Sequence, residues 1–319
     1  MRAGWTLHPR GAALLMALFI AAIATVIVSG LFWRQFVLMR TIENQQLMSQ
    51  SRLLLRGALD WARAILREDA ARSNYDALSE PWAQPLAETR LDQLGESSAL
   101  ASQATMAGSM EDAQSRLNLR NLVRSDGSAG DAQRAVLARL VSLLSLPEPT
   151  ADLISVYMIA SLTPPAAAGL PGASNGNRPL PLVFPEDLAR IPGLDPAVVP
   201  RLAPYVVVLD MPTPVNFNTA SAEVIAAVAG LSLSDARGLV ADRDHTYFNG
   251  VGDILNRLNR LHGGGPGFSG SDVSIGSSYF FIRGEIKLER ADTRMEALVK
   301  RGGPIGQPSP VNLLWEREL

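Results

Sequence analysis

The residues best suited to chemistry in this chain fall into a few short motifs. Gly172, Ser174 and Gly176 fit the pattern G-x-S-x-G, in which a serine acts as a nucleophile. His262 and the three glycines after it match the H-G-G-G segment that supplies backbone N–H groups to an oxyanion. A nucleophile elbow needs a strand before the serine and a helix after it, whereas Ser174 lies between prolines 171 and 179. The H-G-G-G segment also follows the serine, although it should precede it, so these letters do not predict a hydrolase.

The other motifs do not predict a catalytic or cofactor site either. Residues 265–270 match G-x-G-x-x-G, but no predicted strand precedes them and no helix follows, so we expect a loop and no dinucleotide site. His245 is a lone histidine in a predicted loop, which is a weak metal ligand by itself. The absence of cysteine excludes disulfides, thiolate metal sites and a cysteine nucleophile. We therefore expect no enzyme activity and no required cofactor.

Two pairs of acidic residues could bind calcium. Asp126 and Asp131 form one pair, Asp242 and Asp244 the other, and both pairs lie on predicted loops. Calcium prefers clustered carboxylate and carbonyl oxygens. Solvated surface charge is the favoured interpretation of each pair, so calcium binding stays open and no ligands are assigned.

The N-terminal region contains an uninterrupted apolar run. Residues 12–33 carry no charge, and as a helix they can cross the ~30 Å hydrocarbon layer of a membrane. A secretory signal peptide is the alternative, with Arg2 and Arg10 as its basic region and residues 22–24 as a small-residue cleavage site. The apolar run continues to Phe32, beyond that site, which favours a retained anchor.

The helical pattern does not end at the anchor. After Trp33, apolar residues recur at many gaps of three, four or seven, and between Leu31 and Arg56 there is neither proline nor glycine. One continuous helix from residue 12 to about residue 69 would be roughly 85 Å long at 1.5 Å per residue. An anchor followed by a separate helix is the alternative.

Further along the chain, the pattern predicts a mixture of helices and strands. We expect a strand at 117–123, helices at 132–146 and 152–162, and two strands starting at Tyr279 and Arg294. Residues 99–110, rich in Ala, Ser, Met and Gly, indicate an exposed loop.

An internal repeat lies between these parts. Residues 186–202 and 223–239 align without gaps and place Gly193 over Gly230, so each copy reads as helix, glycine turn and helix. Such hairpins often bind DNA, and a membrane-anchored periplasmic DNA-binding protein is the alternative function. However, each turn has one glycine instead of two, Asp195 would face a phosphate, and the net charge of −2 offers no basic surface. Nucleic acid is therefore not the expected partner, and a packing role is favoured.

The elements together predict an α+β fold. A long N-terminal helix packs on a small antiparallel sheet whose strands come from both ends of the soluble chain. A large inserted all-α domain of about 120 residues, with two helix-hairpin-helix-like units, lies between them.

Several segments resemble a known family. The basic leader ending at Gly11, followed by an apolar helix, resembles a type IV prepilin signal. Residues 111–119, 214–220 and 277–301 resemble the acidic-NLN, VNxNTA and closing-strand segments of K-type minor pseudopilins of type II secretion systems. The resemblance spans residues 10 to about 301.

The resemblance implies a specific N-terminal chemistry. Prepilin peptidase would cut between Gly11 and Ala12 and methylate the new terminus, Ala12. Most pseudopilins carry glutamate as the fifth residue after the cut, where it partners the amine of another subunit; here that residue is Met16. An unpaired ammonium in a low-dielectric bundle is costly. The missing carboxylate is typical of the K-type subunit and implies a position at the filament tip.

The same resemblance implies an organisation and a location. We expect a leader at 1–11, a transmembrane and filament-core helix at 12–33, pilin-like parts at 34–125 and 263–319, and an inserted domain at 126–262. The protein is expected to cross the Gram-negative inner membrane once, with its C-terminal domain in the periplasm. Its expected partners are the I- and J-type, then the H-type, minor pseudopilins and the major pseudopilin.

Overall fold

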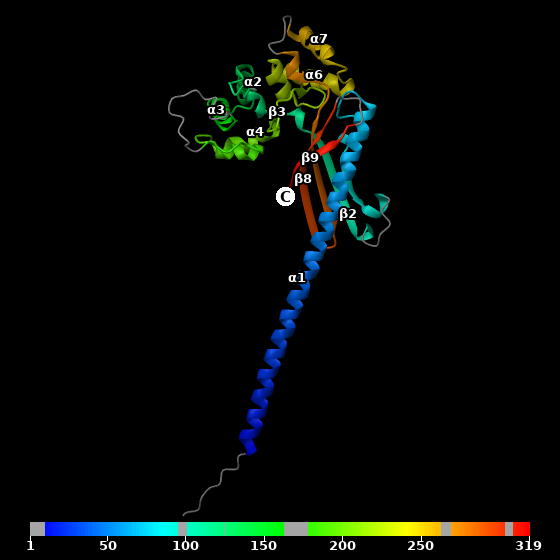
Figure 1. The fold of residues 1–319 in the computed structure, drawn as a ribbon, viewed down its shortest axis with the longest axis vertical. Helices are drawn as coiled ribbons and strands as arrows, with labels where there is room; N and C mark the ends of the chain where they lie inside the picture. The colour runs from blue at the N-terminus through cyan, green and yellow to red at the C-terminus, as the bar shows by residue number, and fades with distance from the viewer. Residues whose placement is uncertain (1–9, 95–100, 125, 163–177, 263–268, 304–308) are drawn as a thin grey trace, which may run out of the picture.

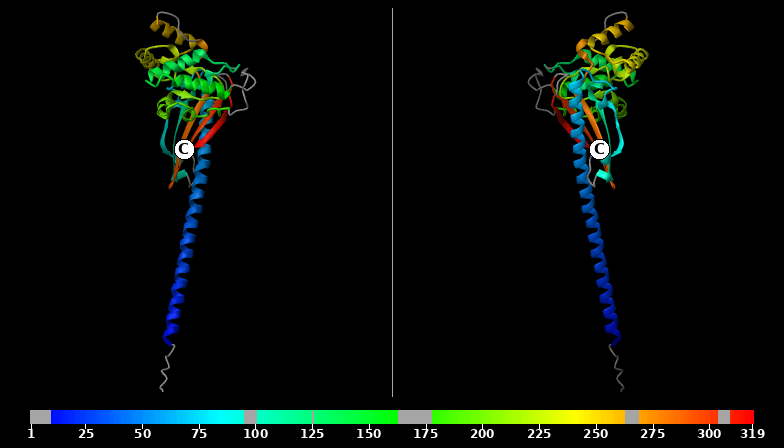
Figure 2. Two further views of the ribbon diagram at one scale, coloured as in Figure 1. Left: turned by 90° about the vertical axis from the view of Figure 1, so that its left-hand side faces the viewer. Right: turned by 90° about the vertical axis from the view of Figure 1, so that its right-hand side faces the viewer.

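One long helix organises the whole molecule. The computed structural model describes residues 10–94, 101–124, 126–162, 178–262, 269–303 and 309–319. Helix α1 (Arg10–Arg72) is 63 residues long; its C-terminal part lies along a sheet, and its N-terminal part extends away from all other elements (Figure 1). The two side views in Figure 2 show the same projecting helix.

The predicted continuity of α1 is confirmed. Gly57 does not interrupt the helix, so the alternative of two separate helices is wrong. The face that packs on the sheet repeats every three or four residues, as an amphipathic helix requires. Its buried members are Ser51, Leu55, Leu59, Ala62, Leu66 and Ala70.

The sheet is antiparallel throughout and draws its strands from both ends of the soluble chain, as predicted. Its strand order is β1-β2-β7-β8-β9. The strands are β1 (Leu86–Arg90), β2 (Ala104–Asp112), β7 (Tyr279–Leu288), β8 (Ala291–Arg301) and β9 (Val311–Glu318). Strands β7 and β8 confirm the two strands predicted near the C-terminus.

The loop predicted at 99–110 is wrong over most of its length. Residues Ala104–Asp112 form β2, which pairs with β7 from Ala104↔Leu288 to Asp112↔Phe280. Thr105 is the one β-branched residue in the segment, whereas a typical strand contains several. It is held because β7 offers a complete hydrogen-bonding partner and because Ala104 and Met106 are buried in the core under α1.

The insert leaves the sheet after β2 and returns to it at β7. Its helices are α2 (Asp131–Leu143), α3 (Thr150–Leu162), α4 (Val199–Leu202), α5 (Ala222–Ala229), α6 (Leu233–His245) and α7 (Val251–His262). It is not purely helical, because β3 (Leu117–Asn118) pairs in parallel with β4 (Val206–Val207), and β5 (Val215–Asn216) with β6 (Val273–Ser274). The strand predicted at 117–123 is limited to its first two residues, after which a 3-10 helix (Leu119–Leu122) follows.

Short 3-10 helices connect these elements. Besides the 3-10 helix at Leu119–Leu122, they are η1 (Pro81–Ala83), η2 (Leu91–Leu94), η3 (Ala101–Gln103), η4 (Ala113–Ser115), η7 (Pro185–Arg190), η8 (Pro196–Val198), η9 (Ala203–Tyr205) and η10 (Gly270–Asp272).

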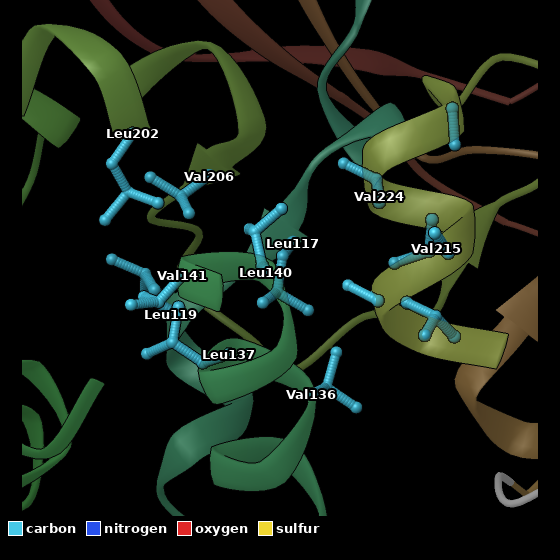
Figure 3. Packing of buried hydrophobic residues seen from close by; sticks show 14 of the residues in the cluster. Leu117, Leu119, Val136, Leu137, Leu140, Val141, Leu202, Val206, Val215 and Val224 are labelled. Carbon is cyan, nitrogen blue, oxygen red and sulfur yellow. The ribbon is translucent and has the colours of Figure 1, made fainter. Parts of the chain in front are cut away.

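The insert has a hydrophobic core of its own. Leu137 and Leu140 of α2 belong to this core together with Leu117 and, on its opposite side, Val224 of α5 (Figure 3). This core extends from Leu117 to Val273 and thus draws on residues on both sides of the expected range 126–262. A smaller cluster, which includes Leu209, Tyr279 and Phe281, joins the insert to the sheet.

The hairpin repeat is present, although its two copies differ. In the second copy, α5 and α6 meet at 119° across Gly230, close to the angle of helix-turn-helix pairs. In the first copy, the elements on both sides of Gly193 begin as 3-10 helices. Both glycines have a positive φ, +84° at Gly193 and +68° at Gly230, a conformation that an L side chain rarely adopts. The aligned glycines therefore mark the same turn.

Candidate functional site: the exposed helix and its buried polar junction

The N-terminal half of α1 contacts no other part of the described chain. Every side chain in residues 12–42, here called the stem, is exposed, and most of them are apolar. An apolar surface of this size marks a site that contacts lipid or protein. The stem belongs to α1, which is long and apolar enough to cross a membrane, with a mean hydropathy of 2.6 over its best window.

The three residues predicted to matter for processing and assembly lie at the start of this stem. The bond between Gly11 and Ala12 is in the first turn of α1, and Met16 lies one turn further on the same helix face as Ala12. Met16 is 70% exposed. The first acidic residue of the chain is Glu43, so the stem offers no carboxylate anywhere along its length. Cleavage and methylation stay predictions.

At the opposite end, α1 is tied to the rest of the molecule by a buried cation. Arg301, the last residue of β8, donates from Nη1 to Asp69 Oδ2 at 3.2 Å, in the last turns of α1. Its Nη2 donates to Asp76 Oδ2 at 2.6 Å and to the carbonyl oxygen of Ser277 at 2.7 Å. The guanidinium also lies over the Phe280 ring, 5.0 Å from the centroid. One side chain thus joins α1, the chain after α1, the start of β7 and the end of β8.

A second buried carboxylate extends this junction into the insert. Asp112 Oδ2, at the end of β2, accepts from Thr219 Oγ1 at 2.5 Å, Ser277 Oγ at 2.6 Å and Asn216 Nδ2 at 2.9 Å. Asn216 Nδ2 also lies 3.0 Å from the carbonyl oxygen of Asp76. The polar residues of the V-N-F-N-T-A segment therefore fix the insert to the sheet. We call the set Asp69, Asp76, Asp112, Asn216, Thr219, Ser277 and Arg301 the junction.

The next asparagine of that segment acts within the insert. Asn218 Oδ1 accepts from the backbone N–H of Phe248 at 2.8 Å, and its Nδ2 donates to the Phe248 carbonyl at 3.1 Å. Both groups are buried, so the pairing satisfies polar atoms that would otherwise be costly. Two asparagines two residues apart thus serve two different attachments.

The junction holds more carboxylates than cations, and this affects their protonation. Burial raises the pKa of Asp76 to about 7. Burial, helped by the nearby Glu80 carboxylate, raises the pKa of Asp69 to about 6. Within the described structure, Asp76 Oδ1 is buried without a hydrogen-bond partner. The junction therefore retains protons at a pH where exposed carboxylates have lost theirs.

Among the described residues, neither acidic pair considered for calcium belongs to a group of three or more close ligand side chains, and calcium binding stays a prediction. Asp126 accepts from the backbone N–H of Ser128 at 2.8 Å, and Asp131 lies in the first turn of α2. The loop expected at 242–245 is wrong, because Asp242, Asp244 and His245 all belong to α6. Asp244 instead forms an ion pair with Arg243 at 3.2 Å.

A third group of acids gathers at the junction. Oxygen atoms of Asp69, Asp76 and Glu80 lie within 4.8 Å of one another. Arg301 contacts two of these residues, while Glu80 Oε2 accepts from the N–H of Ala77 at 2.8 Å and from Trp82 Nε1 at 3.1 Å. The guanidinium therefore already supplies the positive charge that a cation would bring.

Backbone amides just after each hairpin glycine already have side-chain hydrogen-bond partners. Asp195 accepts from the N–H of Ala197 at 2.9 Å, and Ser232 Oγ accepts from the N–H of Asp235 at 3.1 Å. Arg243 donates to two backbone carbonyls and is buried. These contacts support the packing interpretation of the repeat over phosphate binding.

The serine, histidine-glycine and G-x-G-x-x-G motifs lie largely outside the described residues. Gly172, Ser174 and Gly176 fall in the range 163–177, and the glycines after His262 fall in 263–268. His262 itself is the last residue of α7.

Sequence reasoning did not find the junction, because its members lie far apart in the chain. Arg301 and Asp69 are separated by 232 residues, and Asn216 and Asp112 by 104. The one local signal was the V-N-F-N-T-A segment, which has three polar side chains between apolar residues of the insert core.

Known proteins are similar to this chain in both sequence and fold. Two family models, each described as type II secretion system protein K, match residues 115–212 and 215–267. The type II secretion system protein K of Pseudomonas aeruginosa is 27% identical over 92% of this chain and 89% of its own length. Its counterpart from Klebsiella pneumoniae is 29% identical over 78% of this chain and 79% of its own length.

The fold also matches a solved structure. A chain from the crystal structure of the GspK-GspI-GspJ complex of enterotoxigenic Escherichia coli aligns with a TM-score of 0.63 and 21% identity. The alignment covers 87% of this chain and 98% of the other. This likeness confirms the predicted pilin-like α+β fold.

Proposed function

We propose that this chain, which belongs to the type II secretion system protein K family, is the structural minor pseudopilin at the tip of the pseudopilus. There it would initiate or cap assembly for protein export across the outer membrane. The family places the chain in a secretion system; the tip position and the capping role are the proposal. A structural role of this kind requires neither catalysis nor a cofactor.

The observation that carries the proposal is the stem. It is a helix that is apolar and exposed on all sides, so it is suited both to lipid and to a bundle of like helices. It lacks the carboxylate that would neutralise the terminal amine of a subunit above, since Met16 stands at that position. A subunit without this carboxylate can have others below it and none above.

The position of the insert supports the same placement. The insert lies at the end of α1 opposite the stem and extends to one side of the sheet (Figure 1). A subunit stacked above would have to share that space. At the tip, no such subunit exists.

The partners and the location follow from this role. The matched crystal structure is a complex of GspK with GspI and GspJ, which supports I- and J-type minor pseudopilins as direct partners. The H-type and the major pseudopilin would follow below them. The protein would sit in the Gram-negative inner membrane, spanning it once, with its soluble part in the periplasm, until prepilin peptidase processes it and it enters the pseudopilus.

The N-terminus gives the most direct test. After co-expression with prepilin peptidase, intact-mass analysis should show a chain that begins at a methylated Ala12. The matched control is Gly11→Leu, which should keep the full leader. A chain that retains residues 1–11, or one cut after Ala24, would contradict the proposal.

The tip position has a separate test. If Met16 defines the tip, Met16→Glu should allow a subunit to dock above and should reduce secretion and the yield of complete pseudopili. Met16→Leu is the control and should behave as the native chain. Normal secretion and assembly with Met16→Glu would remove the argument from the missing carboxylate.

A further inference from the structure

The stem is longer than the apolar layer of a membrane. Residues 12–42 extend for about 46 Å at 1.5 Å per residue, whereas the hydrocarbon layer is ~30 Å thick. The uncharged residues 12–33 match that thickness, and Arg34 is the first charged residue after them. When residues 12–33 span the hydrocarbon, residues 34–42 pass through the headgroup layer on the side of the soluble part.

Residues 34–42 combine two arginines with apolar side chains on all sides of the helix. The exposed apolar side chains are Phe36, Val37, Leu38, Met39 and Ile42. A single protein partner covers one face of a helix and would leave the others in water. The boundary between headgroups and hydrocarbon accommodates apolar and cationic side chains around the whole helix, because long cationic side chains reach from it into the headgroup layer. This segment has the composition of such a boundary.

One row of side chains runs along the segment. Trp33, Phe36, Arg40 and Glu43 follow at steps of three, four and three residues, so they share a helix face. The ring centroids of Trp33 and Phe36 are 6.3 Å apart, and the guanidinium carbon of Arg40 lies 5.4 Å from the Phe36 centroid. The Arg40 side chain therefore points back toward the N-terminus of α1, as side chains in a helix do. Its charge lies closer to the membrane than its own backbone.

The same row connects the stem to the sheet. Arg290, in the turn between β7 and β8, donates from Nη2 to Glu43 Oε2 at 3.1 Å and from Nε to Asn44 Oδ1 at 2.6 Å. Arg40 Nη1 also lies 3.1 Å from Glu43 Oε2, so two guanidinium groups share one carboxylate oxygen. This turn is the end of β7 and β8 that faces the stem (Figure 1).

Cations outnumber carboxylates at this level of the molecule. The cations are Arg34, Arg40 and Arg290, and the carboxylates are Glu43 and Glu289. Arg34 is exposed, and it has no hydrogen-bond or ion-pair partner in the described part of the chain. A guanidinium group presents paired N–H donors that match the oxygens of a phosphate. We call Trp33, Arg34, Phe36, Arg40, Glu43 and Arg290 the collar.

We propose that the collar binds the phosphate groups of anionic phospholipid and holds the β7–β8 turn at the membrane surface before assembly. Trp33 and Phe36 would lie at the edge of the hydrocarbon, while the three arginines contact the headgroups. The inference rests on the proposed function only in that α1 spans the membrane. It adds a lipid class and the residues that recognise it.

The test uses the full-length chain in phosphatidylcholine vesicles that contain a trace of spin-labelled phosphatidylglycerol or of spin-labelled phosphatidylcholine. The electron spin resonance signal of lipid immobilised by the protein gives the ratio of the two association constants. In the native chain this ratio should favour phosphatidylglycerol. Arg34→Gln, Arg40→Gln and Arg290→Gln should each lower it by about two- to fivefold, since each removes one cation at the membrane surface.

The matched control is Arg72→Gln. Arg72 is an exposed arginine in the last turn of the same helix, at the end opposite the stem. The ratio should equal that of the native chain. All variants keep Arg2 and Arg10, so any lipid preference that these residues cause cancels from each comparison.

Each outcome decides between the two proposals. If the native chain immobilises neither lipid, α1 does not span the membrane and the proposed function fails. If the native chain immobilises both lipids equally, or if the collar variants keep the native ratio, the collar inference fails while the function stands. If the variants keep the ratio and instead lower the yield of pseudopili, the collar contacts other subunits, which also overturns the inference.

Discussion

In residues 12–42 every side chain of α1 is exposed, whereas between Ser51 and Ala70 one face of the same helix is buried against the sheet. Leu18 is 60% exposed and Leu59 is 4% exposed, although both are leucines in regular helix. The backbone hydrogen bonds are the same in both halves. The difference shows that the C-terminal half packs within one chain, while no part of the described chain buries the stem.

The largest effect should come from breaking the ion pairs that anchor the buried half. Arg301→Met leaves Asp69 and Asp76 without their cation, and loss of one partner from a buried pair costs about 3–5 kcal/mol of unfolding free energy. Urea denaturation of the full chain in detergent, followed by tryptophan fluorescence, measures the loss.

The double variant Arg301→Met with Asp76→Asn serves as the control, because it also removes one of the uncompensated charges and should recover part of that loss. A single-variant loss below about 1 kcal/mol would show that the junction is not strongly stabilising.

A matched pair of leucine variants compares the two halves directly. Leu59→Ala removes a buried side chain and should lower the unfolding free energy by about 3 kcal/mol, because it leaves a cavity between α1 and the sheet. Leu18→Ala should change it by no more than about 0.5 kcal/mol, since no part of the described chain contacts that side chain. Equal losses in urea denaturation would mean that the stem packs on the chain's own soluble part.

A smaller effect should appear as a dependence on pH. Asp76 and Asp69 have pKa values of about 7 and 6 in the folded protein, above the ordinary aspartate pKa of 3.8. The folded state therefore binds more protons than the unfolded state, and unfolding releases them. The stabilisation is complete below about pH 4 and is lost as the pH rises through the folded values of about 6 and 7.

Thermal unfolding between about pH 5 and pH 8 measures this loss. Asp76→Asn should flatten the profile, since the amide does not titrate, and the exposed Asp126→Asn should leave it unchanged. A native profile that rises toward pH 8 would show that these carboxyl groups are ionised in the folded protein.

The sequence was informative wherever an element depends on its own periodicity. The continuity of α1, helices α2 and α3, and the strands from Tyr279 and Arg294 all follow patterns that a short window contains. The aligned glycines at 193 and 230 likewise identified two equivalent turns, since the left-handed backbone favours glycine.

Elements that depend on a distant partner could not be predicted in this way. Strand β2 has a sequence typical of a loop and is a strand because β7 pairs with it from a position more than 160 residues away. The junction is similar, because Arg301 is an ordinary basic residue until the fold places Asp69 and Asp76 beside it. Gly11, Ala12 and Met16 were singled out by family resemblance; the structure adds their helical setting, and their roles stay predictions.

The uninterrupted course of α1 has a mechanical consequence. Its 63 residues extend for about 95 Å without a proline or a kinked segment, and Asp69 near its far end is held by Arg301. An axial force on the N-terminal end of α1 would therefore pass along the helix backbone into β8 and, through Asp76 and Asn216, into the base of the insert. Through these contacts, the far end of α1 is coupled to both the sheet and the base of the insert.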